Sequence, residues 1–144
     1  MHPKLFIDRL DDEKVVAAIA EAELSTSGEV RVCIAHRRNA DTMAAAQKCF
    51  LKMGMNRTRH RNAVLVYFAP HEQLFAICGD VGIHDQCGDQ FWQDVTAQIT
   101  PLLKAHQLTE AVVLAVRRIG EALSTYFPRG PDDNHQLPNP IVRD

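Results

Sequence analysis

The sequence predicts an α/β fold, a three-layer α/β/α sandwich in which a small mixed sheet is flanked by about four helices. Three observations support this class. Four segments carry apolar residues at helical spacing and are interleaved with strand-like segments. Residues 63–69 form a near-continuous apolar run, which is typical of a central strand buried on both faces. Residues 74–78 follow after a turn at 70–73, so these two strands are expected to form an antiparallel hairpin.

The helices are expected at residues 11–24, 39–54, about 89–103 and 109–127. Asp11 or Asp12 can cap the first helix and Asp41 the second, because a short acidic side chain accepts hydrogen bonds from the N–H groups of the first turn. Gly54 suits the C-terminal cap of the second helix. Thr109 is the expected cap of the fourth.

Residues 29–35 alternate in the two-residue period of a strand. The helix between this strand and the run at 63–69 forms a crossover connection, which makes the two strands parallel and the connection right-handed. The strand at 74–78 runs back against the second. The sheet therefore contains two parallel strands and an antiparallel hairpin strand.

The composition changes abruptly after residue 128. Residues 1–128 are interpreted as one α/β domain, since a chain of 144 residues is the size of a single core. Residues 129–144 form a Pro/Asp-rich tail without a core of its own. Three alternatives stay open for this tail. It docks along the domain surface through Leu137 and Ile141, it is an interaction segment for a protein partner, or it is disordered.

The overall charge and hydropathy exclude several classes of partner. The formal net charge is -2 and the sequence pI is about 6.4, so we expect no binding to nucleic acid or to acidic membranes. No apolar run approaches the ~20 residues needed to span a bilayer, and the first residues lack the apolar core of a secretory signal. We therefore expect a cytoplasmic protein, in which the cysteines act as small hydrophobes.

Residues 78–92 are the richest in candidate ligands, because aspartates lie among glycines directly after the third strand. The strand directions extend this site. Glu29 and Asn62 stand at the starts of the two parallel strands, and Asp80 follows a strand that runs the opposite way. All three should therefore project from one edge of the sheet. Asp85 and Asp89 are expected on the loop that leaves this edge. We call these five residues, Glu29, Asn62, Asp80, Asp85 and Asp89, the rim.

Carboxylate and carbonyl oxygens of this kind favour a hard divalent cation, Ca²⁺ or Mg²⁺. We expect the cation to bind Asp80, Asp85, Asp89 and Glu29. The other expected ligand-binding residues are Asn62, Gly79, Gly82 and Arg61. In the alternative interpretation, Asp89 caps the third helix while Asp80 and Asp85 stabilise turns through their own backbone.

A metal-dependent phosphatase at the rim is the alternative function. Asp80 would then be the nucleophile or a metal ligand, and arginines of the basic loop at 57–61 would hold the phosphate. The sequence contains no nucleophile–base pair and no Gly-rich phosphate loop, so a non-catalytic role is favoured. A zinc site at Cys78, His84 and Cys87 is disfavoured, since there is no Cys-x-x-Cys pair. Cys87 is either an exposed redox thiol or a partly buried inert one.

Short motifs in a fixed order resemble the TPM domain family, the family of thylakoid-lumen phosphatase-like and repair-protein domains. They lie at residues 20–23, 26–32, 57–65, 79–83, 89–92, 119–123 and 126–128, and residues 132–138 resemble the tail of the short bacterial members. The resemblance covers about residues 11–128 and points to the short, stand-alone bacterial members. It implies a compact α/β sandwich, calcium binding in the acidic loops of some relatives and acid phosphatase activity in the plant lumenal branch. The sequence thus predicts a TPM-like binding or adaptor module for a divalent cation or small polar ligand. The alternative is an acid phosphatase acting on phosphomonoesters.

Overall fold

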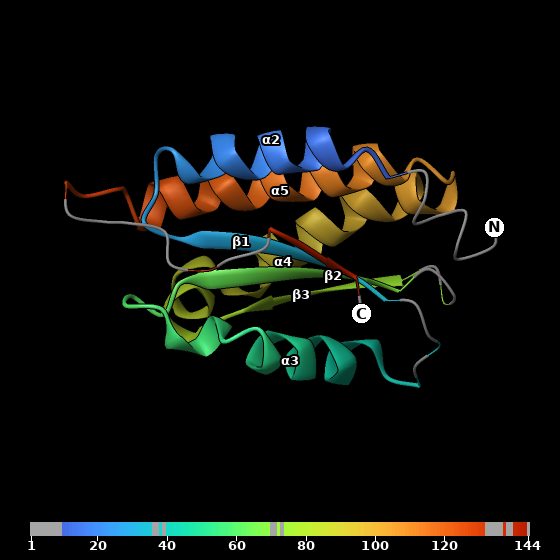
Figure 1. Cartoon of the computed structure of the whole chain (residues 1–144), viewed down its shortest axis with the longest axis horizontal. Coiled ribbons are helices and arrows are strands. Elements are labelled where there is room, and N and C mark those ends of the chain that lie inside the picture. Colours follow the sequence, from blue (N-terminus) through green and yellow to red (C-terminus); the bar gives the residue numbers. More distant parts are fainter. Residues whose placement is uncertain are drawn as a thin grey trace.

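The computed structural model describes residues 10–35, 38, 40–69, 72, 74–131, 137 and 140–143. Its elements are α2 (Asp12–Glu23), β1 (Glu29–Ile34), α3 (Thr42–Lys52), the 3-10 turn η1 (Met55–Arg57), β2 (Ala63–Ala69), β3 (Leu74–Gly79), α4 (Val81–Lys104), α5 (Leu108–Tyr126) and β4 (Ile141–Arg143). The described strands form one sheet in the order β3-β2-β1-β4. Figure 1 shows this sheet between helical layers, so the predicted three-layer α/β/α sandwich is confirmed.

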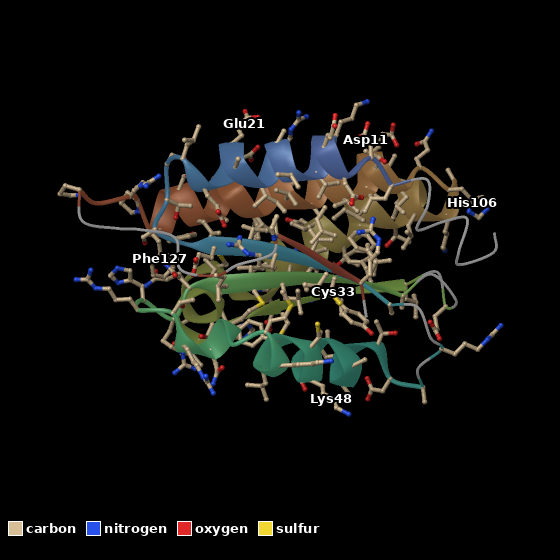
Figure 2. All side chains as sticks on the ribbon, viewed as in Figure 1. Asp11, Glu21, Cys33, Lys48, His106 and Phe127 are labelled. Atoms are coloured by element: carbon tan, nitrogen blue, oxygen red, sulfur yellow. The ribbon has the colours of Figure 1, made fainter. Side chains whose placement is uncertain are left out.

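The two faces of the sheet bury two separate cores. Helices α2, α4 and α5 cover one face, where Val64, Val66 and Phe68 point, and α3 covers the other (Figure 1). Figure 2 shows sulfur atoms gathered between the sheet and α3, where the labelled Cys33 lies. Every residue of β1 and β2 is buried. Because both faces are covered, β2 reads in the sequence as a continuous apolar run.

The strand directions predicted from the connections are confirmed. β1 and β2 are parallel with Glu29 opposite Ala63, and β2 and β3 are antiparallel with Val64 opposite Gly79. The starts of β1 and β2 and the end of β3 therefore lie at the same end of the sheet. This arrangement positions the candidate site.

The helix N-termini are set by short side-chain caps. Asp11 caps α2 by accepting from the N–H of Lys14 (3.2 Å), and Asp41 caps α3 by accepting from the N–H of Ala44 (3.0 Å). Both predicted caps are confirmed. The predicted cap at Thr109 is wrong, because α5 already begins at Leu108. The Thr109 hydroxyl instead accepts from the backbone N–H of Asp11 (3.1 Å) and so ties the first turns of α2 and α5 together.

The predicted loop between Asp80 and Asp89 is wrong. α4 begins directly at Val81, and Asp80 is its N-cap. The backbone N–H of Gly82 donates to the carbonyl of Arg61 (2.9 Å), and a Cβ at Gly82 would lie 2.6 Å from that oxygen. Glycine is thus needed here for a close backbone approach, not for a flexible loop. Gly88, with φ 75° and ψ 167°, interrupts the helix just before the residue where the sequence predicted its start.

The C-terminal tail adds a fourth strand to the three predicted. β4 pairs in parallel with β1, placing Ile141 opposite Val32. Leu137 and Val142 pack against the core under α3, and Ile141 packs against the opposite core. The docking alternative therefore holds for these residues. Residues 132–136, 138–139 and 144 lie outside the described residues, as does the predicted turn at 70–73 except residue 72.

Within the described residues, no helix combines the length and apolar character needed to cross a bilayer.

Candidate functional site

The structure brings Glu29, Asn62 and Asp80 to the same end of the sheet, as the strand directions predicted. The backbone N–H of Asp80 donates to the carbonyl of Ala63 (2.9 Å), which extends the pairing of β2 and β3 by one residue toward Asn62. The three rim residues are 2%, 1% and 5% exposed. Their side chains are therefore inside the protein surface, and each must find a partner there.

Asp80 is paired with Arg61 through both carboxylate oxygens. Arg61 donates from Nε to Oδ2 (2.6 Å) and from Nη2 to Oδ1 (2.8 Å), while the N–H of Val81 also donates to Oδ1 (2.8 Å). The hydrogen bond and the charge of Asp80 raise the pKa of Arg61, which stays protonated. The carboxylate side chain is 4% exposed, whereas that of Arg61 is 48% exposed. A half-exposed arginine thus covers a buried carboxylate.

Glu29 holds the C-terminal tail. Its Oε1 accepts a hydrogen bond from the backbone N–H of Leu137 (2.7 Å). Arg31, two residues along β1, donates to the carbonyl of the same Leu137. Arg31 also donates to Glu23 Oε2 (2.8 Å), which in turn accepts from the N–H of Val30 (2.8 Å). We call Glu23, Glu29 and Arg31 the tail clasp, because together they bind both backbone groups of one tail residue.

Sequence reasoning missed the roles of Glu23 and Arg31. Both are buried, with Glu23 8% and Arg31 4% exposed. The available signal was an arginine within a largely apolar strand, since a charge that such a strand buries requires an ion partner. Glu23, at the end of the preceding helix, was the nearest acid along the chain to that strand apart from Glu29.

Asn62 has a local role at the start of β2. Its Nδ2 donates to the hydroxyl of Ser27 (3.1 Å), in the turn that precedes β1. A Cβ at Gly28 in the same turn would lie 3.2 Å from the carbonyl oxygen of Asn62. The side-chain amide of Asn62 therefore joins the starts of the two parallel strands, β1 and β2.

Asp85 and Asp89 are on α4, not on a loop, and both are exposed. Among the described residues, no group of three or more histidine, cysteine, aspartate or glutamate side chains is arranged to hold a metal ion. The structure thus assembles part of the rim, around Asp80 and Arg61, without a preformed cation cage in the described part of the chain. Calcium or magnesium binding by the rim stays a prediction.

The thiols near the rim are poor nucleophiles. Burial raises the pKa of Cys78, and the negative charge of Asp80 raises it further. Burial also raises the pKa of Cys87. A reactive thiol requires the opposite shift, so the inert interpretation of Cys87 is the better one.

Comparisons with known proteins identify the family. The family model described as the TPM domain matches residues 3–122. The NMR structure of the BA42 protein from the psychrophilic bacterium Bizionia argentinensis is 34% identical, with a TM-score of 0.85 over 94% of this chain and 96% of that one. The N-terminal domain of the cg2496 protein from Corynebacterium glutamicum is 16% identical, with a TM-score of 0.61 over 86% of this chain and 77% of that one, and supports the fold alone. The search of curated proteins found no match. The chain belongs to the TPM domain family.

Proposed function

We propose that this protein is a non-catalytic binding module in which Asp80 takes a divalent cation, Ca²⁺ or Mg²⁺, when Arg61 turns out to solvent. One observation carries the proposal. The carboxylate of Asp80 is buried, yet its charge is balanced by a side chain that is 48% exposed. The guanidinium of Arg61 therefore occupies the place that a cation would take beside this carboxylate.

Physical chemistry favours such an exchange. Ion pairs with a solvent-exposed partner contribute little to stability, because water solvates the released charge. Mg²⁺ retains several waters and is commonly bound by only one or two carboxylates, so a cage of many acidic side chains is not required. Asp85 follows on an exposed part of the same helix, about 7 Å further along the axis. Its charge adds to the negative potential there. We expect weak, millimolar affinity.

Phosphatase chemistry at Asp80 would need a base or a metal-held water beside it, and the sequence contains no nucleophile–base pair, which favours binding over catalysis. Turnover of a phosphomonoester tests the alternative. We expect no turnover of p-nitrophenyl phosphate with Mg²⁺ above that of an Asp80→Asn control. Turnover that this substitution abolishes would replace the binding module with a phosphatase.

Cation binding is tested by following backbone amide shifts while Ca²⁺ or Mg²⁺ is added to millimolar concentration. We expect saturable shifts in residues 79–89 of the wild-type protein. Asp80→Asn keeps a capping oxygen at the start of α4 and is expected to remove the shifts. Absence of shifts in this segment, or equal shifts in the Asn variant, contradicts cation binding at Asp80. A protein partner for the C-terminal tail is a separate proposal that these titrations leave unchanged.

A further inference from the structure

β3 is an edge strand whose outer side carries backbone groups with no partner strand among the described residues. In an antiparallel pair, successive residues direct their N–H and C=O alternately toward and away from the neighbouring strand. The N–H of Asp80 donates to the carbonyl of Ala63, so Asp80 and every second residue before it direct their backbone groups toward β2. Phe75 belongs to the other set. The carbonyl of Phe68, which lies opposite Phe75, accepts from the N–H of Ala35 and not from β3, which confirms this alternation. The backbone groups of Phe75, Ile77 and Gly79 therefore point to the free edge.

A groove of about 770 Å³ lies along this edge, lined by residues of α3, β3 and α4. We call it the β3 groove. Its walls are largely apolar and come from three elements: Met43 of α3, Phe75 and Ile77 of β3, and Trp92 of α4. Met43 is 43% exposed, and Leu74 at the start of the strand is 53% exposed. The groove thus combines unpaired strand edge with accessible apolar surface, which is how proteins recognise an extended peptide.

The charge of the groove selects among peptides. Among the described residues that line it, the charged side chains are Asp41 and Glu72, and both are acidic. Glu72 precedes β3, and Asp41 caps α3 at the end of the groove near Leu74. A lysine or arginine in the ligand would be attracted to this end, whereas an acidic residue would be repelled.

We propose that the β3 groove binds an extended segment of another protein, which adds to β3 as a fifth strand. The segment is apolar, since its side chains face α3 on one side and α4 on the other. It carries a basic residue at the end beside Asp41 and Glu72. The inference uses no residue of the rim and goes beyond the cation-binding role.

Tryptophan fluorescence provides a direct test, because Trp92 lines the groove and is the single tryptophan of the chain. The probe is a capped peptide of four alternating valine and isoleucine residues with a lysine at each end, so that either strand direction places one lysine beside Glu72. The titration is carried out with a chelator, which makes its outcome independent of cation binding. We expect saturable fluorescence change and amide shifts in residues 74–79.

Two altered peptides separate strand addition from simple apolar contact. N-methylation of alternate amides removes backbone donors while keeping the side chains. Glutamate in place of both lysines reverses the charge. Each change is expected to weaken binding by about tenfold or more. Equal binding by the methylated peptide would overturn strand addition.

Two protein variants provide matched controls. Ile77→Pro removes an N–H that points to the free edge, so pairing with β2 is retained while a ligand strand loses a donor. Met43→Lys places a positive charge on the α3 wall at an exposed position that contributes little to the fold. Both are expected to weaken peptide binding by about tenfold, with thermal unfolding still cooperative. Full binding by both variants contradicts the proposal. Concentration-dependent dimerisation that protects the β3 amides would also overturn it, in favour of a second copy of the chain as occupant.

Discussion

Two arginine–carboxylate pairs of this protein have short contacts and opposite environments. Arg31 donates to Glu23 at 2.8 Å in the tail clasp, where the side chains are 5% and 10% exposed. Arg61 donates to Asp80 at 2.6 Å, where the arginine is 48% and the carboxylate 4% exposed. The shorter distance belongs to the more exposed pair. Distance therefore does not separate the two environments, whereas access of water to the arginine does.

The two pairs differ in the partners and charges that remain when the arginine is removed or turns away. If Arg31 is removed, Glu23 keeps the N–H of Val30, but its carboxylate stays inside the protein without the counter-charge, and the carbonyl of Leu137 loses this donor. If Arg61 turns away, its guanidinium is hydrated, and Asp80 keeps the N–H of Val81. We infer that the tail clasp stabilises the fold. We infer also that the Arg61–Asp80 pair, called the rim pair below, is available for exchange.

The largest effect is expected for the buried pair. Arg31→Ala should lower the free energy of unfolding by about 3–5 kcal/mol, because it leaves a buried carboxylate without its counter-charge. Urea unfolding followed by circular dichroism measures this loss. The matched control is Arg61→Ala, which should reduce stability far less. Similar losses for the two variants would show that water access does not distinguish the pairs.

A smaller effect is expected when the clasp loses its hold on the tail. Glu29→Ala removes the acceptor of the Leu137 N–H and should cost about 1–3 kcal/mol. The N–H of Val32 donates to the carbonyl of Pro140 at the start of the β1–β4 pairing. Its hydrogen exchange should therefore accelerate more than that of the β2 amides. Uniform acceleration across the sheet would mean that Glu29 supports the whole domain and not specifically the tail.

The charge on Asp80 can be sensed through its neighbour Cys78. Burial and the charge of Asp80 both raise the pKa of this thiol, so its alkylation should begin at a more alkaline pH than that of an ordinary thiol. Asp80→Asn removes the negative charge, which favours the thiolate and lowers the pKa. Peptide-resolved mass spectrometry after iodoacetamide treatment gives the pH midpoint. Cys87, whose pKa is raised by burial alone, is the internal control and should not shift.

The features predicted from sequence are those that depend on local patterns. The apolar run of β2 and the alternation of β1 indicated the sheet, and the crossover helix determined their parallel direction. Asp11 and Asp41 were recognisable as caps because capping involves residues three apart in the chain. The location of Glu29, Asn62 and Asp80 at one end of the sheet followed from these elements.

The features that sequence could not predict depend on distant contacts. The start of α4 at Val81 requires the backbone of Gly82 to meet the carbonyl of Arg61, which is 21 residues earlier. β4 has only three residues and no pattern of its own, and it forms by pairing with β1, which is distant in the sequence. The partners of Asp80 and Glu29 are similarly non-local, so a shared acidic site was predicted where these two carboxylates each have a separate donor.

The most direct test of the displaceable rim pair compares two variants that remove the same charge. Arg61→Ala exposes Asp80, whereas Arg118→Ala removes an arginine paired with Glu121 on α5. We predict that Arg61→Ala increases the apparent affinity for Ca²⁺ or Mg²⁺ severalfold over wild type, with amide shifts in residues 79–89. Arg118→Ala should bind as wild type. Equal affinities of the two variants, or shifts at Glu23 and Arg31 instead of residues 79–89, would contradict the account.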